Sequence, residues 1–177
     1  MMQFKAYTCR KYEFFREGIG LILGILCAFV VVVADQLSKY AVLHWWLGEL
    51  VGIKISDFFN IVRAWNTGVS FSMFNNYGKL GAYILSAAAI VIVIMLLCWL
   101  KSEKNRLSQV ALGLIMGGAL GNVVDRLRFG AVFDFLDFHI NDSHWPAFNV
   151  ADSCICVGAA IIIAQAFWIQ INKSKEK

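Results

Sequence analysis

Acidic residues are scarce in this chain: aspartate and glutamate supply 12 of its 177 residues, whereas 59% of the residues are hydrophobic. A soluble domain is usually about 45–50% apolar, so this composition excludes a single water-soluble core. Proline is rarer still, since Pro146 is the only one. Internal repeats and low-complexity segments are also missing. We therefore predict one polytopic membrane domain over residues 1–177.

Several short motifs with known chemistry are absent as well. The five cysteines include no Cys-x-x-Cys pair, and four of them lie in apolar stretches, so we interpret them as reduced, packed thiols. The sequence contains neither a glycine-rich loop that would hold a phosphate nor the Asp-Thr-Gly signature of soluble aspartic proteases. No Ser-His-Asp set converges on one segment. These absences leave few nucleophilic mechanisms open.

Four apolar segments are long enough to cross a bilayer, which takes about 20 apolar residues. We predict four transmembrane helices over about 18–39, 80–100, 107–124 and 150–171. The basic residues cluster near the N-terminus, in the turn 101–106 and in the C-terminal tail, and the positive-inside rule places these segments, with both termini, in the cytoplasm. The loops 40–79 and 125–149 then face outward. The net charge of +4 is a topology signal, and no nucleic-acid partner is expected.

The first long loop has the pattern of a short hairpin. Apolar runs at 53–55 and 58–62 are separated by Ser-Asp, and Asn66-Thr67-Gly68 marks a turn after them. We therefore predict a small extramembrane β-element in this loop, resting on the bilayer. The third predicted helix carries glycines at spacing four, Gly113, Gly117 and Gly121. Such a stripe lets helix backbones approach closely.

Two groups of polar residues border the predicted helices. Asp35 and Lys39 are four residues apart and meet on one helix face, as an ion pair at the interface or as part of a functional site. Asn122, Asp125 and Arg126 share another helix face. Asp125 and Arg126 could form a plain ion pair, or Asn122 and Arg126 could hold a peptide backbone by hydrogen bonds.

Two further carboxylates lie at apolar boundaries. Asp134 is enclosed by Val132-Phe133 and Phe135, and Asp152 begins the fourth predicted helix, three residues after Asn149. A structural explanation for Asp152 is a capping box with Asn149, but charges near a membrane are functional candidates by default. Two carboxylates in one poorly solvated site share a proton. That arrangement can activate water for peptide hydrolysis.

Two alternatives remain at this point. A zinc site could be assembled from a histidine and aspartate cluster in the second long loop, Asp137, His139, Asp142 and His144. A small proton- or ion-coupled transporter would also use carboxylates near the membrane. Against transport, the polar residues gather at one membrane face, and helices two and four supply almost no polar groups toward the cytoplasmic side.

Five blocks of the sequence together resemble the lipoprotein signal peptidases, the bacterial type II signal peptidases. They are Asp35–Lys39, Asn66–Phe71, Gly117–Arg126, Val132–Phe135 and Trp145–Ser153. The blocks occur in the family's order, and the first seventeen residues and the C-terminal tail lie outside them. Phe133 stands where the family usually has an aliphatic residue.

The resemblance implies a four-helix inner-membrane aspartyl endopeptidase with its active site at the outer face. Its expected substrates are prolipoproteins whose cysteine carries a diacylglyceryl group, cut just before that cysteine. Expected partners are membrane lipids and cyclic peptide inhibitors such as globomycin; no metal or organic cofactor is expected. By motif, the catalytic residues would be Asp134 and Asp152. Residues implied to bind substrate or support the site are Asn66, Gly68, Asn122, Arg126, Asn149, Asp35, Lys39 and Asp125.

Overall fold

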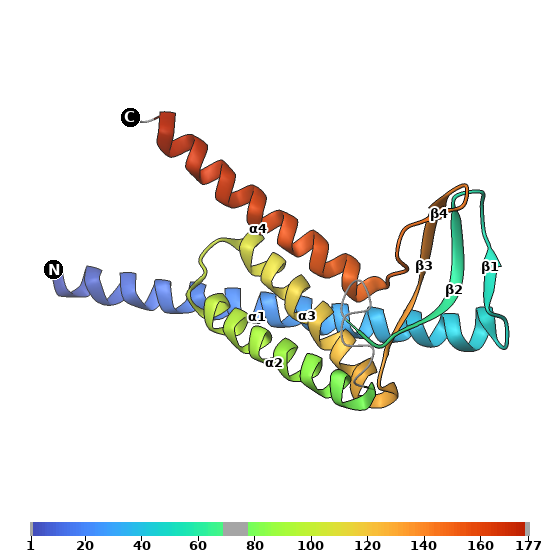
Figure 1. Cartoon of the computed structure of the whole chain (residues 1–177). Helices are drawn as coiled ribbons and strands as arrows, with labels where there is room; N and C mark the ends of the chain where they lie inside the picture. The colour runs from blue at the N-terminus through green and yellow to red at the C-terminus, as the bar shows by residue number, and fades with distance from the viewer. Residues whose placement is uncertain (1, 69–77, 176–177) are drawn as a thin grey trace.

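A computed structural model describes residues 2–68 and 78–175, and the side chains of 18–68 and 79–174. Its long helices are α1 (Met2–Ala41), α2 (Gly78–Ser102), α3 (Arg106–Phe129) and α4 (Val150–Lys175). Within the described residues, these four helices are long and apolar enough to cross a membrane. Helix α3 contacts the other three, while α4 diverges from the bundle toward its C-terminal end (Figure 1). The predicted four-helix membrane fold is confirmed.

The third helix is longer than the sequence suggested. It continues past the expected end near residue 124 and stops at Phe129, so Asp125 and Arg126 belong to α3 and not to the second long loop. The carboxylate of Asp125 is tolerated there because it is buried against a lysine, Lys39 of α1. Gly130 ends the helix with φ 74°, and its N–H donates to the carbonyl of Arg126. This left-handed conformation favours glycine.

An antiparallel sheet covers one end of the bundle (Figure 1). Its strands, in spatial order, are β1 (Gly52–Lys54), β2 (Phe59–Asn66), β3 (Val132–Ile140) and β4 (Ser143–His144). The hairpin predicted in the first loop exists as β1 and β2, but the sheet also takes two strands from the second loop, which the prediction left out. Residues 132–135 are buried on both faces, which a continuous apolar run permits. A short π-helix, Val42–Leu47, connects α1 to this sheet. We call this end of the molecule the sheet end.

The glycine stripe of α3 faces α1, and the two backbones approach closely there, as the spacing predicted. A side chain at Gly113 would meet the carbonyl oxygen of Gly24 at 2.5 Å, and one at Gly117 would meet that of Ala28 at 2.6 Å. At Gly121 the obstacle would be Oδ2 of Asp35 at 2.7 Å. The close contact of α1 and α3 therefore leaves room for a buried carboxylate between them.

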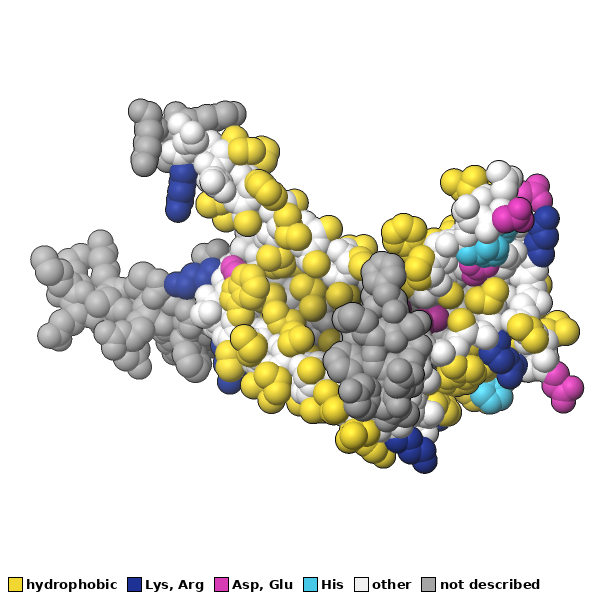
Figure 2. Space-filling view, viewed as in Figure 1, with side chains coloured by type: hydrophobic (Ala, Val, Ile, Leu, Met, Phe, Trp, Pro, Cys, Tyr) yellow, Lys and Arg dark blue, Asp and Glu magenta, His cyan; other side chains and the backbone are white. Residues whose placement is uncertain are grey.

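The apolar surface follows the helices and the charges lie near their ends (Figure 2). One buried core joins Ala28, Leu100, Leu112 and Met116 within the bundle, and a second lies under the sheet. Of the five cysteines, the four whose side chains the structure describes are free thiols, in agreement with the sequence analysis. Most of the buried polar side chains lie at the sheet end, although Ser86 in α2 and Ser108 and Gln109 near the start of α3 are buried as well.

Candidate active site

Asp134 is held on the central strand β3. Phe133 and Phe135 point to the opposite face, where they pack in the core under the sheet with Ile61 of β2. The alternation of the strand therefore directs Asp134 toward the helices, and its side chain is 3% exposed. Nδ2 of Asn66, near the end of β2, donates to Oδ2 of Asp134 at 3.2 Å.

Asp152 is held by a capping box at the start of α4. The N–H of Asp152 donates to Oδ1 of Asn149 at 2.9 Å, and the N–H of Asn149 donates to Oδ2 of Asp152 at 3.2 Å. The structural explanation offered from sequence is thus correct. It does not exclude a functional one, because Nδ2 of Asn149 donates to Oδ1 of Asp134 at 2.7 Å. Asn149 therefore contacts both carboxylates, that of Asp134 through its side-chain amide and that of Asp152 through its backbone N–H.

Asn122 of α3 supports the pair from the helix side. Its Nδ2 donates to Oδ1 of Asp152 at 2.7 Å, while its Oδ1 accepts from Asn149 at 3.2 Å and from Nζ of Lys39 at 3.3 Å. Gly68 acts through its backbone, since its N–H donates to Oδ1 of Asn66 at 3.1 Å and fixes that amide's orientation. The remainder of that motif, residues 69–71, lies outside the described residues.

A buried ion-pair network lies directly beside the carboxylate pair. Nζ of Lys39 is 2.8 Å from Oδ2 of Asp35 and 2.8 Å from Oδ2 of Asp125, and all three residues are at most 4% exposed. The N–H of Ala151 donates to Asp35 at 3.0 Å, and the N–H of Phe133 donates to Asp125 at 3.1 Å. The network therefore fixes the backbone one residue before each of Asp134 and Asp152.

Sequence reasoning did not single out Gln36, which belongs to this network. Its Nε2 donates to Oδ1 of Asp125 at 2.9 Å, with longer contacts to Oδ2 of Asp35 at 3.2 Å and the carbonyl of Gly121 at 3.3 Å. Its position inside the block Asp35–Lys39 is the sequence signal that could have identified it. Gln36 satisfies carboxylate oxygens that Lys39 alone leaves open.

The two members of the carboxylate pair interact electrostatically. Burial, and then the charge of Asp152, raise the pKa of Asp134 from 3.8 to about 7, although hydrogen bonds from Asn66 and Asn149 and the charge of Lys39 oppose this. A carboxylic acid in this environment holds a proton near neutral pH. Asp134 can therefore donate a proton.

Arg126 is the cation nearest to the carboxylate pair that is not engaged in the Lys39 network. It is half-buried and feels the charges of Asp152, Asp134 and Asp125. Its buried Nε has no hydrogen-bond partner among the described residues. The plain Asp125–Arg126 ion pair considered from sequence is not formed, because Asp125 pairs with Lys39. Arg126 is therefore available to bind a ligand's carbonyl or carboxylate oxygen.

The structure does not support the zinc alternative. No three His, Cys, Asp or Glu side chains in the described part of the chain lie in an arrangement that could hold a metal ion. His144 contacts Asp137, but Nδ1 of His139 bonds the carbonyl of Asn141 at 3.0 Å, and Asp142 is exposed. The remaining predicted site residues, Asp134 and Asp152 above all, do come together at the sheet end.

The helices and the buried polar groups define a multi-pass membrane protein with a carboxylate site at one end. Residues 27–168 match the family model of signal peptidase (SPase) II. This match covers most of the chain, so the chain belongs to the signal peptidase II family, a family of bacterial membrane peptidases.

Similar proteins agree with this assignment. The lipoprotein signal peptidase of Alteromonas mediterranea is 41% identical over 167 residues, which cover 93% of this chain and 90% of the relative. The lipoprotein signal peptidase of Aeromonas hydrophila is 43% identical, covering 86% of this chain and 90% of the relative. A solved structure described as a bacterial membrane enzyme superimposes with a TM-score of 0.73 at 32% identity, covering 85% of this chain and 90% of that one.

Proposed function

We propose that this chain is an aspartyl endopeptidase that removes signal peptides from diacylglyceryl-modified prolipoproteins, cutting just before the lipidated cysteine. The relatives named lipoprotein signal peptidases support the substrate class. One observation carries the mechanism: the side-chain amide of Asn149 donates to the carboxylate of Asp134 and its backbone N–H donates to the carboxylate of Asp152, so that two carboxylates face one site. Membership in a peptidase family replaces the transporter alternative.

The proposed reaction uses one proton shared by the pair. Ionised Asp152 takes a proton from a water molecule, whose oxygen attacks the carbonyl carbon of the scissile bond. Protonated Asp134 donates its proton to the carbonyl oxygen, and a tetrahedral diol forms. Asp152 then returns a proton to the leaving amide nitrogen as the C–N bond breaks, and Asp134 recovers its own. Both groups thus end in their starting states.

The amides and Arg126 would bind the peptide around the scissile bond. Arg126 lies close to both carboxylates, and a charge-assisted hydrogen bond to a peptide carbonyl is stronger than a neutral one. Such a bond would orient the substrate backbone. The loop 40–79 would act as a lid or cradle over the peptide, with β1 and β2 as part of it; residues 69–77 lie outside the described residues.

The lipid would set the depth of the scissile bond. Two acyl chains left in the bilayer contribute about 0.8 kcal/mol for each buried CH₂, which anchors the cysteine near the level of the site. We therefore expect unlipidated prolipoprotein to be cleaved slower by at least about a hundredfold, because positioning contributes strongly to catalysis. Cyclic peptides of the globomycin type would compete for the same site.

We place the sheet end at the outer face of the membrane. The start of α1, the turn 101–106 and the end of α4 lie at the opposite end (Figure 1), and these segments carry most of the basic residues. A reporter fused after Asn141 should therefore be exported, whereas one fused after Glu103 should remain in the cytoplasm. Cytoplasmic activity of the Asn141 fusion would contradict this orientation.

Purified protein in detergent provides the direct test of the function. It is incubated with a prolipoprotein carrying diacylglyceryl-cysteine, and mass spectrometry follows the freed signal peptide. We expect a peptide ending at the residue before the cysteine. The same detergent with unlipidated substrate is the control for the lipid's contribution. Release of no peptide from the lipidated substrate by folded protein would disprove the proposal.

A further inference from the structure

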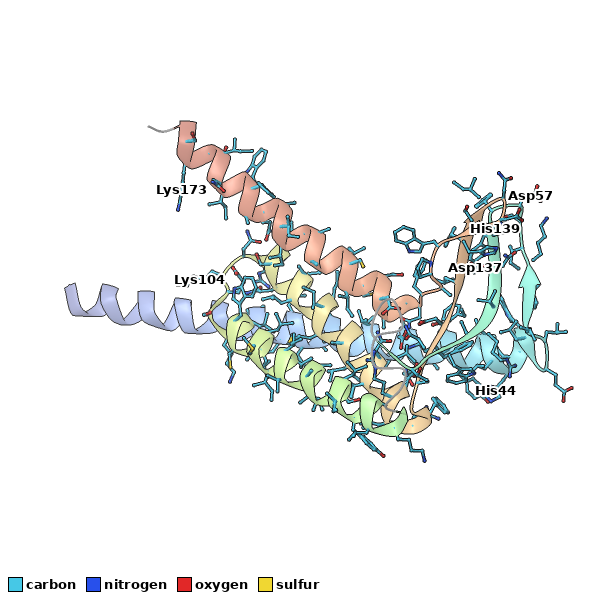
Figure 3. The ribbon with its side chains drawn as sticks, in the orientation of Figure 1. His44, Asp57, Lys104, Asp137, His139 and Lys173 are labelled. Atoms are coloured by element: carbon cyan, nitrogen blue, oxygen red, sulfur yellow. The ribbon has the colours of Figure 1, made fainter. Side chains whose placement is uncertain are left out.

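A further buried carboxylate, Asp137, lies on β3 and is not used by the proposed mechanism. It is 6% exposed, and Nδ2 of Asn60 on β2 donates to its Oδ2 at 2.9 Å. Nδ1 of His144 on β4 lies 2.9 and 3.0 Å from its two oxygens. Figure 3 shows Asp137 and His139 on the sheet. One carboxylate thus joins three strands.

The Asp137–His144 contact fixes the start of the segment that returns from β4 along β3 to α4. Residue 144 pairs with residue 139 across β3 and β4, and the chain then returns along β3. Phe148 exchanges hydrogen bonds with Leu136 at 2.8 and 3.1 Å, and its carbonyl also accepts from Phe135 at 3.1 Å. The next residue is Asn149, whose side-chain amide donates to the carboxylate of Asp134 and whose backbone N–H donates to that of Asp152.

We propose that Asp137 and His144 are positioning residues for the carboxylate pair. By fixing the start of the returning segment on β3, they hold Phe148 in register beside Leu136, and this register places the Asn149 amide between the two aspartates. Neither residue touches the reacting atoms. This inference rests on the proposed function, because it assigns the pair a role in that reaction.

The charges around His144 favour its contact with Asp137. Asp137 faces it from β3, and the His139 ring stacks on it with centroids 4.7 Å apart. Burial raises the pKa of Asp137, but hydrogen bonds from Asn60 and His144 outweigh burial, so that this pKa lies below its usual value. Asp57, at the turn between β1 and β2, is paired with Lys54 and lies in electrostatic range of His139. Asp137 is therefore the ionised partner of His144 at neutral pH.

The test compares cleavage of lipidated prolipoprotein by wild-type enzyme, His144→Ala and Asp137→Asn. We expect kcat to fall about tenfold in each, with KM changed less than about twofold, since misplacement of catalytic groups lowers the rate more than binding. The double variant should be no slower than either single variant, because the two residues act as one unit. His144→Asn, whose amide can replace Nδ1, should recover most of the rate. The control is His44→Ala, an exposed histidine on the π-helix, with wild-type rates expected.

The pH profile separates positioning from general destabilisation. The hydrogen bond from Asn149 to Asp134 lowers the pKa of Asp134. In His144→Ala this bond should be weaker, so the pH at which kcat declines on the alkaline side should be higher. Asp152, Lys39 and Asn66, which face Asp134 from the other elements, are unchanged. A uniform loss of rate at all pH values would overturn the proposal.

Unchanged kcat in His144→Ala and Asp137→Asn would also overturn it, provided the wild type cleaves. If the wild type does not cleave, the proposed function fails instead. If His144→Ala does not fold, a comparison of His144→Asn with His144→Leu provides the same test. The two side chains are of broadly similar size, and only asparagine can donate a hydrogen bond to Asp137. Equal rates for these two variants would contradict the proposal.

Discussion

Two pairs of buried carboxylates lie side by side at the sheet end, and their partners differ. Asp35 and Asp125 share the ammonium group of Lys39, at 2.8 Å each, and are further held by backbone N–H groups. Asp134 and Asp152 are bonded by amides: Asn149 bonds both, Asn66 bonds Asp134 and Asn122 bonds Asp152. Lys39 gives the first pair a shared cation, whereas in the second pair burial and the charge of Asp152 raise the pKa of Asp134. The first pair is therefore suited to anchoring and the second to proton transfer.

The two pairs are coupled through Asn122. Its oxygen accepts from Lys39, and its nitrogen donates to Asp152. The ion-pair network thus orients an amide that would otherwise be free to rotate, and the orientation determines which atom faces Asp152. Lys39 thus fixes the direction of the neutral hydrogen bond that Asn122 donates to Asp152.

The largest expected effect is on the pair held by amides. Asp134→Asn and Asp152→Asn should each lower kcat at least about a thousandfold, because an amide cannot exchange the proton that water activation requires. Membrane insertion and thermal unfolding should be little changed. The exposed Asp142→Asn is the control and should cleave normally. Residual activity that is sensitive to chelators in Asp134→Asn would point to metal chemistry instead.

Removing the cation tests the anchoring pair. Lys39→Met leaves Asp35 and Asp125 without their shared counter-ion, and we expect a loss of about 3–5 kcal/mol of stability. Denaturant or thermal unfolding in detergent measures this loss of stability. The control is Lys104→Met, in the turn between α2 and α3 at the opposite end of the bundle. Stability equal to wild type would show that the two carboxylates do not depend on Lys39.

The pH dependence should report the amide-held pair. With the pKa of Asp134 raised to about 7, cleavage should decline above pH 7, by about tenfold per unit once Asp134 is ionised. The folded state binds its proton more tightly than the unfolded state, so this group's stabilisation is present at low pH and is lost as pH rises through about 7. Asp134→Asn should therefore lose less stability than wild type between pH 5 and 8. If the stability of wild type and of Asp134→Asn changed equally with pH, the assignment of the raised pKa to Asp134 would be contradicted.

The smallest expected effect concerns His139 and metal removal. His139→Ala should change kcat less than about twofold, since the half-buried ring bonds a backbone carbonyl in its own turn through Nδ1. Chelators should leave the wild-type rate unchanged. A large chelator effect on the wild type would return the zinc alternative to consideration.

Local patterns explain why much of this protein was predictable. The length of apolar runs defines the four helices, because only such runs are stable in lipid. Spacing of four residues places Gly113, Gly117 and Gly121 on one helix face, and spacing of three builds the Asn149–Asp152 capping box. The resemblance to the signal peptidases named both aspartates and most of their supporting residues. Each of these features depends on residues that are close in sequence or on motifs that the sequence itself contains.

Only the tertiary structure decided which groups meet. Lys39 could have paired with Asp35 alone, yet it also takes Asp125 from α3, and this contact lets α3 extend to Phe129. The strand β3 joins β2 across the two outer loops, and its register pairs Asp137 with Asn60 and Asp134 with Ala64, which brings the Asn66 side chain, two residues further along β2, within hydrogen-bond distance of Asp134. Pairing between distant segments is set by packing and strand register, because a shift of one residue would turn every side chain of the strand to the other face.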